Sequence, residues 1–233
     1  MDSKINHCVG SPIRLLFIGN SATYVHDLPG TLSRLAQKAG YPVECASNVK
    51  GGAELSKHAD YSSELGQKAL EMIRKGYDIV FMQDNGNCVS SEAMKLASRD
   101  AARILGAEIF ASGAKAGLYV RPPYGHEKWG LDPFAQCHAF DTHFLEISQM
   151  LGSVNVYVNR AFAFAIRDTS YDPWGPDHAH ISEYGAYLAV CTFFATIFNT
   201  SSAVLDANGL PPEDARVLQE IADKVALQGQ APW

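Results

Sequence analysis

A short apolar run that ends in Gly19-Asn20-Ser21 constrains the fold of this chain more than any other feature of its sequence. Residues 13–18 (IRLLFI) are apolar except for Arg14 and are rich in branched and aromatic side chains. The run is too short for a helix, so it predicts a strand buried on both faces of a parallel sheet. Gly19 can adopt backbone angles closed to other residues, which allows a sharp turn where the strand ends.

The same pattern recurs along the chain. Short apolar runs at 41–47, 78–82, 116–120 and 155–158 alternate with segments of helical period at 28–39, 62–75, 91–112, 132–151, 182–198 and 211–228. Parallel strands need crossover connections, which helices provide and which are nearly always right-handed. We therefore expect an α/β fold, a three-layer α/β/α sandwich with a five-stranded parallel sheet, formed by residues 1–233 as a single domain.

The composition argues against several kinds of partner. The chain has a formal net charge of -6 and no cluster of Lys and Arg, so we expect no nucleic-acid partner. No run approaches the roughly 18 apolar residues of a membrane span, and the first twelve residues lack the apolar core of a signal peptide. The sequence as written predicts a cytoplasmic location by default, or secretion if a leader was removed.

Five scattered cysteines without a C-x-x-C pair predict reduced thiols: Cys8, Cys45, Cys88, Cys137 and Cys191.

Glycine and polar residues follow the predicted strands. Ser21 comes after the first strand, Gly51-Gly52 after the second, residues 83–87 (QDNGN) after the third, and residues 121–126 (RPPYGH) after the fourth. The carboxyl ends of parallel strands share one rim of the sheet, where open α/β sheets place their ligands. We therefore expect these four loops to lie close together.

A segment far downstream, Asp177-His178-Ala179-His180, adds a carboxylate and imidazoles. A serine hydroxyl is a poor nucleophile until a histidine takes its proton, and that histidine needs a carboxylate to orient it. The oxyanion that forms needs two or three fixed hydrogen-bond donors. These residue types predict ester cleavage with Ser21 as the nucleophile.

The blocks resemble those of the SGNH (GDSL-type) hydrolases, a family named for one Ser, Gly, Asn and His in four separated blocks. The resemblance spans residues 13–199 and implies a flavodoxin-like fold. Carried onto this chain, Ser21, Gly52, Asn85 and His180 match the four blocks, with Asp177 in the last. The resemblance implies a triad of Ser21, His180 as base and Asp177 as its orienting group. It also implies that the N–H groups of Ser21 and Gly52 and the side-chain amide of Asn85 hold the oxyanion.

The match departs from the family pattern in places. Asn20 stands where many members carry Asp, as in looser Gly-Asn-Ser members, and the third block lacks Gly-x-Asn-Asp. Asn87 or Gln83 could therefore be the amide donor. We favour Asn85 because it lies the same distance past the strand as the Asn of the family's third block. The resemblance to the looser members favours an acetylated carbohydrate as the substrate over a lipid or a thioester. We therefore expect a small-molecule or glycan ester as the partner, cleaved without a cofactor or metal. Side chains predicted to contact the substrate are Tyr24, His26, Arg121, Tyr124, Tyr171 and Trp174.

Two other interpretations remain open. A metal hydrolase would draw ligands from Asp177, His178 and His180, or from His138, Asp141 and His143. Residues 141 and 143 lie two apart in a predicted helix and would point to different faces, which makes a poor chelate. A non-catalytic carbohydrate-binding protein of the same fold would instead stack sugars on Tyr124, Tyr171 and Trp174.

Overall fold

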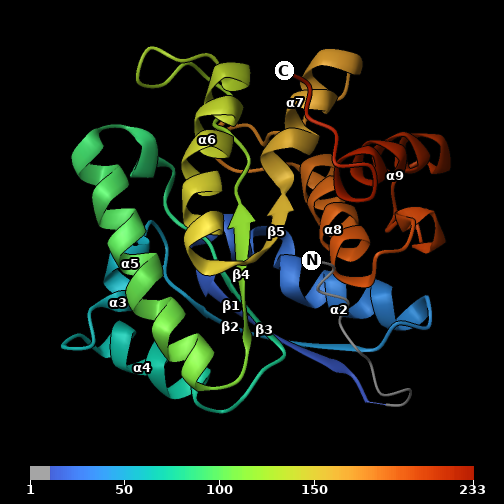
Figure 1. The fold of residues 1–233 in the computed structure, drawn as a ribbon. Coiled ribbons are helices and arrows are strands. Elements are labelled where there is room, and N and C mark those ends of the chain that lie inside the picture. Colours follow the sequence, from blue (N-terminus) through green and yellow to red (C-terminus); the bar gives the residue numbers. More distant parts are fainter. Residues whose placement is uncertain (1–10) are drawn as a thin grey trace.

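The computed structural model describes residues 11–233 and contains one five-stranded parallel sheet (Figure 1). Its spatial order is β2-β1-β3-β4-β5, which is the order of flavodoxin-like sheets. The strands are β1 (Ile13–Gly19), β2 (Val43–Val49), β3 (Ile79–Met82), β4 (Lys115–Val120) and β5 (Val154–Tyr157). The predicted α/β fold with a five-stranded parallel sheet is confirmed. The expectations for Cys8 and for the first ten residues lie outside the described part of the chain.

Helices connect the strands. They are α1 (Ser21–Tyr24), α2 (Leu28–Lys38), α3 (Leu55–Ala59), α4 (Glu64–Ile73), α5 (Glu92–Ala111), α6 (Pro133–Leu151), α7 (Val158–Asp168), α8 (Glu183–Phe198) and α9 (Pro212–Ala226). Single 3₁₀ turns lie at Val25–Asp27, Gly86–Val89 and Ser202–Val204. Side-chain caps begin α2, α5, α6 and α8 at residues of types that favour the N-cap, namely Asp27, Ser91, Asp132 and Ser182.

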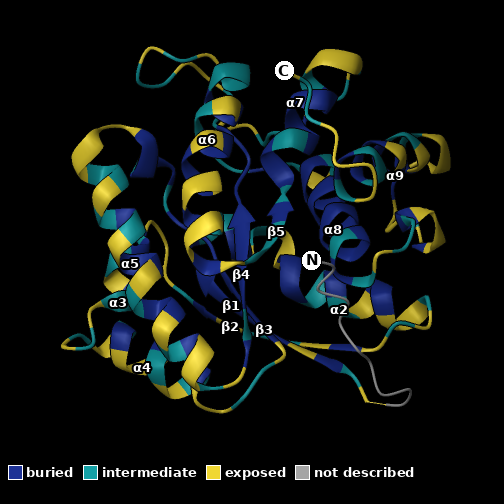
Figure 2. Ribbon diagram, in the orientation of Figure 1, coloured by how far each residue is buried: buried dark blue, intermediate teal, exposed yellow. Residues whose placement is uncertain are grey.

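The sheet has a hydrophobic core on each face. Successive residues of β1 point to opposite sides, so that Leu15 and Phe17 join one core and Leu16 and Ile18 join the other. Side chains of α2, α7, α8 and α9 cover the first face, and those of α3, α4, α5 and α6 cover the second. Figure 2 shows the inner strands as almost wholly buried between these layers.

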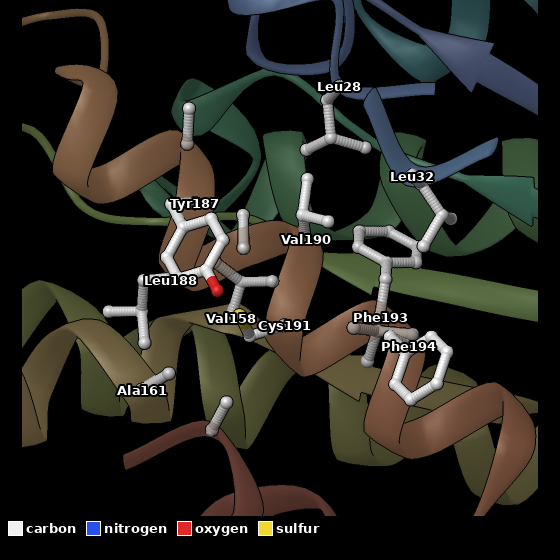
Figure 3. Close-up of a cluster of buried hydrophobic side chains, with 14 of the residues drawn as sticks. Leu28, Leu32, Val158, Ala161, Tyr187, Leu188, Val190, Cys191, Phe193 and Phe194 are labelled. Carbon is white, nitrogen blue, oxygen red and sulfur yellow. The ribbon is translucent and has the colours of Figure 1, made fainter. Parts of the chain in front are cut away.

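Helix α8 is the most deeply buried helix of the first layer. Its Tyr187, Leu188, Val190, Phe193 and Phe194 pack between side chains of α2 and α7, as Figure 3 shows. Burying a side chain such as Leu or Phe stabilises a fold by roughly 1.5–3 kcal/mol. The packing of α8 therefore anchors the segment that precedes it, which carries residues 177–180.

Three helices were not predicted from the sequence. Helix α1 occupies part of a predicted loop, α3 is only one turn long, and α7 extends over residues assigned to the end of a strand and the start of a loop. Helix α7 begins directly after β5 and has no side-chain cap, so its first residues carry no start signal. Its apolar face packs on the sheet.

The described cysteines, Cys45, Cys88, Cys137 and Cys191, form no disulfide among residues 11–233. Burial raises the pKa of each thiol, and it raises that of Cys45 to about 12. Over the same residues, no helix combines the length and the apolar character that crossing a bilayer requires.

Candidate active site

Ser21 is the first residue of α1 and follows the end of β1 closely. The preceding Asn20 is buried and caps this short helix. Its Oδ1 accepts a hydrogen bond from the N–H of Ala22 at 3.0 Å, and its Nδ2 donates to the carbonyl of Ala53 at 2.8 Å. Asn20 thereby ties the turn that presents Ser21 to the loop after β2, which contains Gly52.

Ser21, His180 and Asp177 form a continuous chain of hydrogen bonds. The Nε2 of His180 lies 3.0 Å from the Oγ of Ser21, and its Nδ1 lies 2.6 Å from the Oδ2 of Asp177. A carboxylate at Nδ1 favours the tautomer that carries its proton there, which leaves Nε2 able to accept the serine proton. The arrangement has the atomic order of a nucleophile, a base and an orienting acid.

The carboxylate of Asp177 is held in its charged form. Its hydrogen bond with the His180 ring, followed by those from the backbone N–H groups of His180 and Ala179, keeps the pKa of this carboxyl well below its usual range. The two backbone bonds to Oδ1 measure 2.9 and 3.0 Å. Asp177 is therefore ionised at any pH at which the imidazole could act as a base.

The loop that carries Asp177 and His180 is fastened to the loop after β4. The indole Nε1 of Trp174 donates to the carbonyl of Pro123 at 3.1 Å, and the N–H of Gly125 donates to the carbonyl of His178 at 2.7 Å. The indole packs so closely on Gly125 that a Cβ at that position would lie 2.7 Å from it. These contacts position His180 beside Ser21.

Gly52 and Asn85, which the sequence predicts as hydrogen-bond donors, line the same pocket as Ser21. No acceptor within residues 11–233 contacts the backbone N–H of Ser21 or of Gly52. Gly52 has a left-handed φ of 67°, which other residues adopt at a cost. The side-chain amide of Asn85 donates to the carbonyl of Gly52 at 2.9 Å, and its oxygen accepts from the N–H of Asn87. The second N–H of that amide is left without an acceptor in the described chain.

The structure also separates the possible amide donors. Asn85 lines the pocket above Ser21, whereas Gln83 and Asn87 do not. The Oε1 of Gln83 accepts from the N–H of Asn20 at 2.9 Å and from the Oγ1 of Thr23 at 3.1 Å, and its Nε2 donates to the carbonyl of Asp84. Gln83 is thus a buried support for the turn that carries Ser21.

Asp84 is buried and connects the loops after β2 and β3 through hydrogen bonds. Its Oδ1 accepts from the N–H of Leu55 at 2.7 Å and from the N–H of Asn85 at 2.6 Å. Burial raises the pKa of this carboxyl. No function was predicted for Asp84, although an acidic residue two positions after a fully buried strand was the available signal.

His58 supports the same turn from α3. It is buried, and its Nε2 lies 3.0 Å from the carbonyl oxygen of Gly19. Burial lowers the pKa of His58, so the ring is neutral and its Nε2–H can donate to that carbonyl. Together with Asn20, Gln83 and Asp84, His58 fixes the backbone on which Ser21 stands, and this supporting role was not predicted from the sequence for any of the four.

A pocket of about 270 Å³ opens beside Ser21 and His180. Its wall includes small or apolar residues, namely Ala22, Val25, Pro122 and Ile181. Arg121 and Tyr124 form a further part of the wall, and the substrate contact expected of them stays a prediction. The pocket therefore combines an apolar side, a cation and the donors around the serine.

Four other side chains predicted to contact the substrate do not line this pocket. Tyr24 is largely exposed and its hydroxyl lies over Gly51, outside the pocket. The Nε2 of His26 lies 3.0 Å from the carbonyl oxygen of Ile181, and the ring borders a separate cavity. Neither side chain lines the pocket beside Ser21, and their contact with a substrate stays a prediction.

The aromatic residues of the loop before Asp177 face the protein. Tyr171 stacks on Tyr184 with ring centroids 5.2 Å apart, and its hydroxyl donates to Asp214 at 2.8 Å. Trp174 packs on Gly125 and Phe162. Tyr171 and Trp174 are half-buried and do not line the pocket beside Ser21, so their contact with a substrate stays a prediction.

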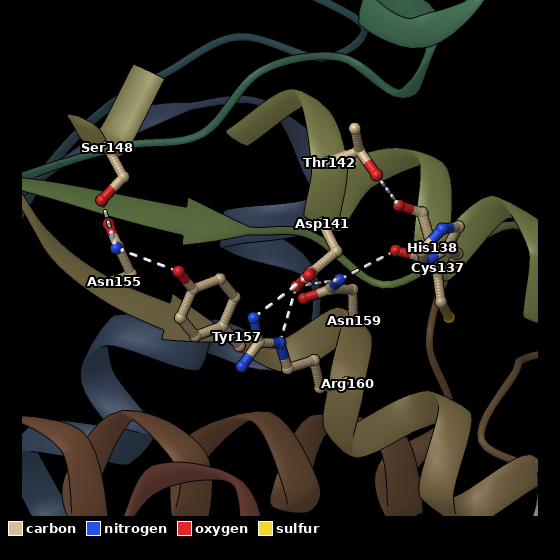
Figure 4. A network of polar contacts seen from close by, with 9 residues as sticks. All are labelled: Cys137, His138, Asp141, Thr142, Ser148, Asn155, Tyr157, Asn159 and Arg160. Carbon is tan, nitrogen blue, oxygen red and sulfur yellow. Dashed lines mark hydrogen bonds and ion pairs between the residues drawn. The ribbon is translucent and has the colours of Figure 1, made fainter. Parts of the chain in front are cut away.

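The second candidate metal cluster is dispersed. Asp141 accepts from Arg160 Nε at 2.6 Å and from Nη2 at 3.1 Å, as Figure 4 shows. The Nε2 of His143 lies 3.0 Å from the Oγ of Ser98, and the ring of His138 packs on Trp233. Within residues 11–233, no three His, Cys, Asp or Glu side chains are arranged to hold a metal ion.

Comparison with known proteins shows the fold. No family model and no curated protein matches the sequence. A DUF4886 family protein from Bacteroides uniformis superposes with a TM-score of 0.79 at 15% identity, over 94% of this chain and 96% of that chain. A putative SGNH hydrolase from Slackia heliotrinireducens gives 0.66 at 23% identity, over 77% and 96%. Axe2, an acetylxylan esterase from Geobacillus stearothermophilus, gives 0.57 at 16% identity, over 83% and 97%. The chain therefore has the fold of the SGNH-type hydrolases.

Proposed function

We propose that this protein is a serine hydrolase that cleaves a carboxylic ester with a short acyl group, an acetyl ester of a carbohydrate being the first candidate. The observation that carries the proposal is the hydrogen-bonded chain from Ser21 through His180 to Asp177, beside backbone N–H groups without acceptors. These are the groups that acyl transfer requires, on a fold known for that chemistry.

The reaction would proceed through an acyl-enzyme. The Oγ of Ser21 attacks the ester carbonyl carbon while its proton passes to the Nε2 of His180. The tetrahedral oxyanion collapses, the bond to the alcohol oxygen breaks, and His180 returns the proton to the leaving alcohol. Water then attacks the acyl-serine with His180 again as base, which releases the carboxylic acid and restores Ser21.

The oxyanion would be held by the backbone N–H groups of Ser21 and Gly52 and by the Nδ2 of Asn85. Asn85 already donates one N–H to the carbonyl of Gly52, so the bond also orients the amide. Removing one such donor in other serine hydrolases lowers turnover by about 10²–10³. We assign the same role to Asn85.

The pocket supports a short acyl group. A volume of about 270 Å³ is at the small end for ligand sites, and the apolar residues beside Ser21 are small or medium-sized. An acetyl group fits this description, whereas a long alkyl chain would leave the pocket. The likeness to Axe2, whose name describes an acetylxylan esterase, supports acetylated carbohydrate as the first class to test.

Two measurements test the proposal. An alkyl fluorophosphonate should label the wild-type protein at Ser21 and should not label Ser21→Ala. Hydrolysis of 4-nitrophenyl esters with two to eight acyl carbons should be fastest for acetate or propionate. Ser21→Ala should hydrolyse none of them. Release of acetate from acetylated xylo-oligosaccharides is the second assay. Full activity of Ser21→Ala would show that the nucleophile is assigned wrongly.

A further inference from the structure

Arg121 is a buried cation in the wall of the catalytic pocket. It follows β4 directly, and only 5% of its surface is exposed. Its Nε donates to the carbonyl of Pro122 at 2.8 Å, which is its one hydrogen bond within residues 11–233. No ion pair of the described chain includes Arg121, so its remaining N–H groups have no protein acceptor.

Its guanidinium group is held in place by packing. It lies over the ring of Tyr124, with Cζ 4.4 Å from the ring centroid, and 5.7 Å from that of Phe140. Gly86 provides the space, since a Cβ there would lie 2.5 Å from both Nη1 of Arg121 and Cε2 of Tyr124. Gly86 follows Asn85, so the cation sits beside the proposed oxyanion donor.

Among residues 11–233, no carboxylate forms an ion pair with this cation. Cys88 and Tyr119 lie near it, and burial raises the pKa of both, so they are neutral. Stacking on Tyr124 offsets part of the cost of burying the guanidinium. A buried charge is normally paired with an opposite one, and Arg121 lacks such a partner.

We propose that Arg121 binds an anionic group of the substrate, a carboxylate or a similar oxyanion close to the ester bond that Ser21 would cleave. That the anion belongs to a substrate rests on the proposed function, whereas the anion site itself does not depend on it. A fixed guanidinium fork matches the two oxygens of a carboxylate. The anion can belong to the acyl group, as in a dicarboxylic monoester, or to the alcohol, as in an acidic sugar.

Two isosteric pairs of esters separate these sources. Monomethyl succinate and methyl succinamate differ only in a charge on the acyl side, and acetoxyacetate and acetoxyacetamide differ only in a charge on the alcohol side. We expect kcat/KM at low ionic strength to favour the carboxylate at least tenfold in one pair. The formal net charge of -6 does not attract anions, so the preference has to arise locally.

Variants then assign the preference to Arg121. The ratio of kcat/KM for the carboxylate over the carboxamide should fall to about one in Arg121→Gln and to an intermediate value in Arg121→Lys. Lys128→Gln is the matched control, because Lys128 lies 3.8 Å from the centroid of the same Tyr124 ring but outside the pocket wall, so its ratio should equal that of the wild type. An unchanged ratio in both Arg121 variants, or no preference in either pair, overturns the proposal.

Binding measured without turnover separates this inference from the proposed function. Calorimetric titration of Ser21→Ala with the same four compounds should show saturable binding of one carboxylate only, lost when Arg121→Gln is added. If Arg121→Gln fails to fold, Arg121→Lys and the loss of binding at high salt decide the matter. Carboxylate binding by a protein that cleaves no ester would refute the esterase and retain the anion site. Equal or undetectable binding of both members of each pair would refute the anion site.

Discussion

The Nε2 of His180 lies 3.0 Å from the Oγ of Ser21, although 159 positions separate the two residues in the chain. Ser21 is placed by the end of β1 and the cap of α1, and His180 by a loop fastened to the residues after β4 and anchored by α8. Two segments of the chain, each held in place by its own contacts, thus bring the hydroxyl of Ser21 to the imidazole of His180. The carboxylate partner of that imidazole, Asp177, is already in place.

Asp177→Asn should lower kcat by about 10²–10⁴ with the fold unchanged, because an amide no longer holds the imidazole in the tautomer that accepts the serine proton. The measurement is kcat and KM on 4-nitrophenyl acetate, with circular dichroism to verify folding. His178→Asn is the control, since His178 has a left-handed φ of 50° that Asn tolerates and contributes no side-chain contact to Ser21. A large loss in His178→Asn with none in Asp177→Asn would reverse the assignment.

The acid limb of the pH profile should report one ionisation. The hydrogen bonds from His180 and from two backbone N–H groups hold the pKa of Asp177 well below its usual range, so this carboxylate stays charged as pH falls to mildly acidic values. Activity should then decline only because the imidazole takes up a proton and can no longer act as base. The dependence of log(kcat/KM) on pH tests this, and a second protonation between pH 4 and 7 would contradict it.

Asp84→Ala should lower kcat more than Asp84→Asn. The Oδ1 of Asp84 accepts from the N–H groups of Leu55 and Asn85, and an asparagine oxygen can keep both bonds whereas alanine leaves two buried donors unsatisfied. Such losses cost about 1–3 kcal/mol of stability for each group. Thermal unfolding and kcat should be measured on both variants. Equal effects would show that charge, and not the two hydrogen bonds, is what the site needs.

Stability should fall between about pH 6.5 and pH 4, in part because of His143. Burial lowers its pKa to about 4, while an unfolded histidine titrates near 6.5. Both states are neutral above pH 6.5, and below it the unfolded state alone gains a proton, so unfolding becomes easier down to the folded pKa. The contribution is at most about 3 kcal/mol. His143→Gln should flatten this part of the stability curve measured by urea unfolding, and an unaltered slope would refute the assignment.

Local pattern was enough to predict much of this fold. The buried strand at residues 13–18 and the helical segments at 132–151 and 182–198 each depend on neighbouring residues only. The strand ends and the resemblance to the SGNH hydrolases predicted that Ser21, Gly52, Asn85 and His180 lie at one rim of the sheet, and all four line one pocket of the structure. Helix α7 escaped prediction because its start has no capping side chain.

The sequence by itself determined the strands, the main helices and the residue types at the carboxyl ends of the strands, since periodicity and capping are set within one or two turns of chain. Only the tertiary structure decided which polar and aromatic residues near that rim face the pocket. Tyr171 and Trp174 resemble binding residues in sequence but pack on the protein, whereas Arg121 is buried in the pocket wall without a countercharge. The direction of a side chain depends on the packing of segments far apart in sequence, and that packing is settled only when the whole sheet and its helices are assembled.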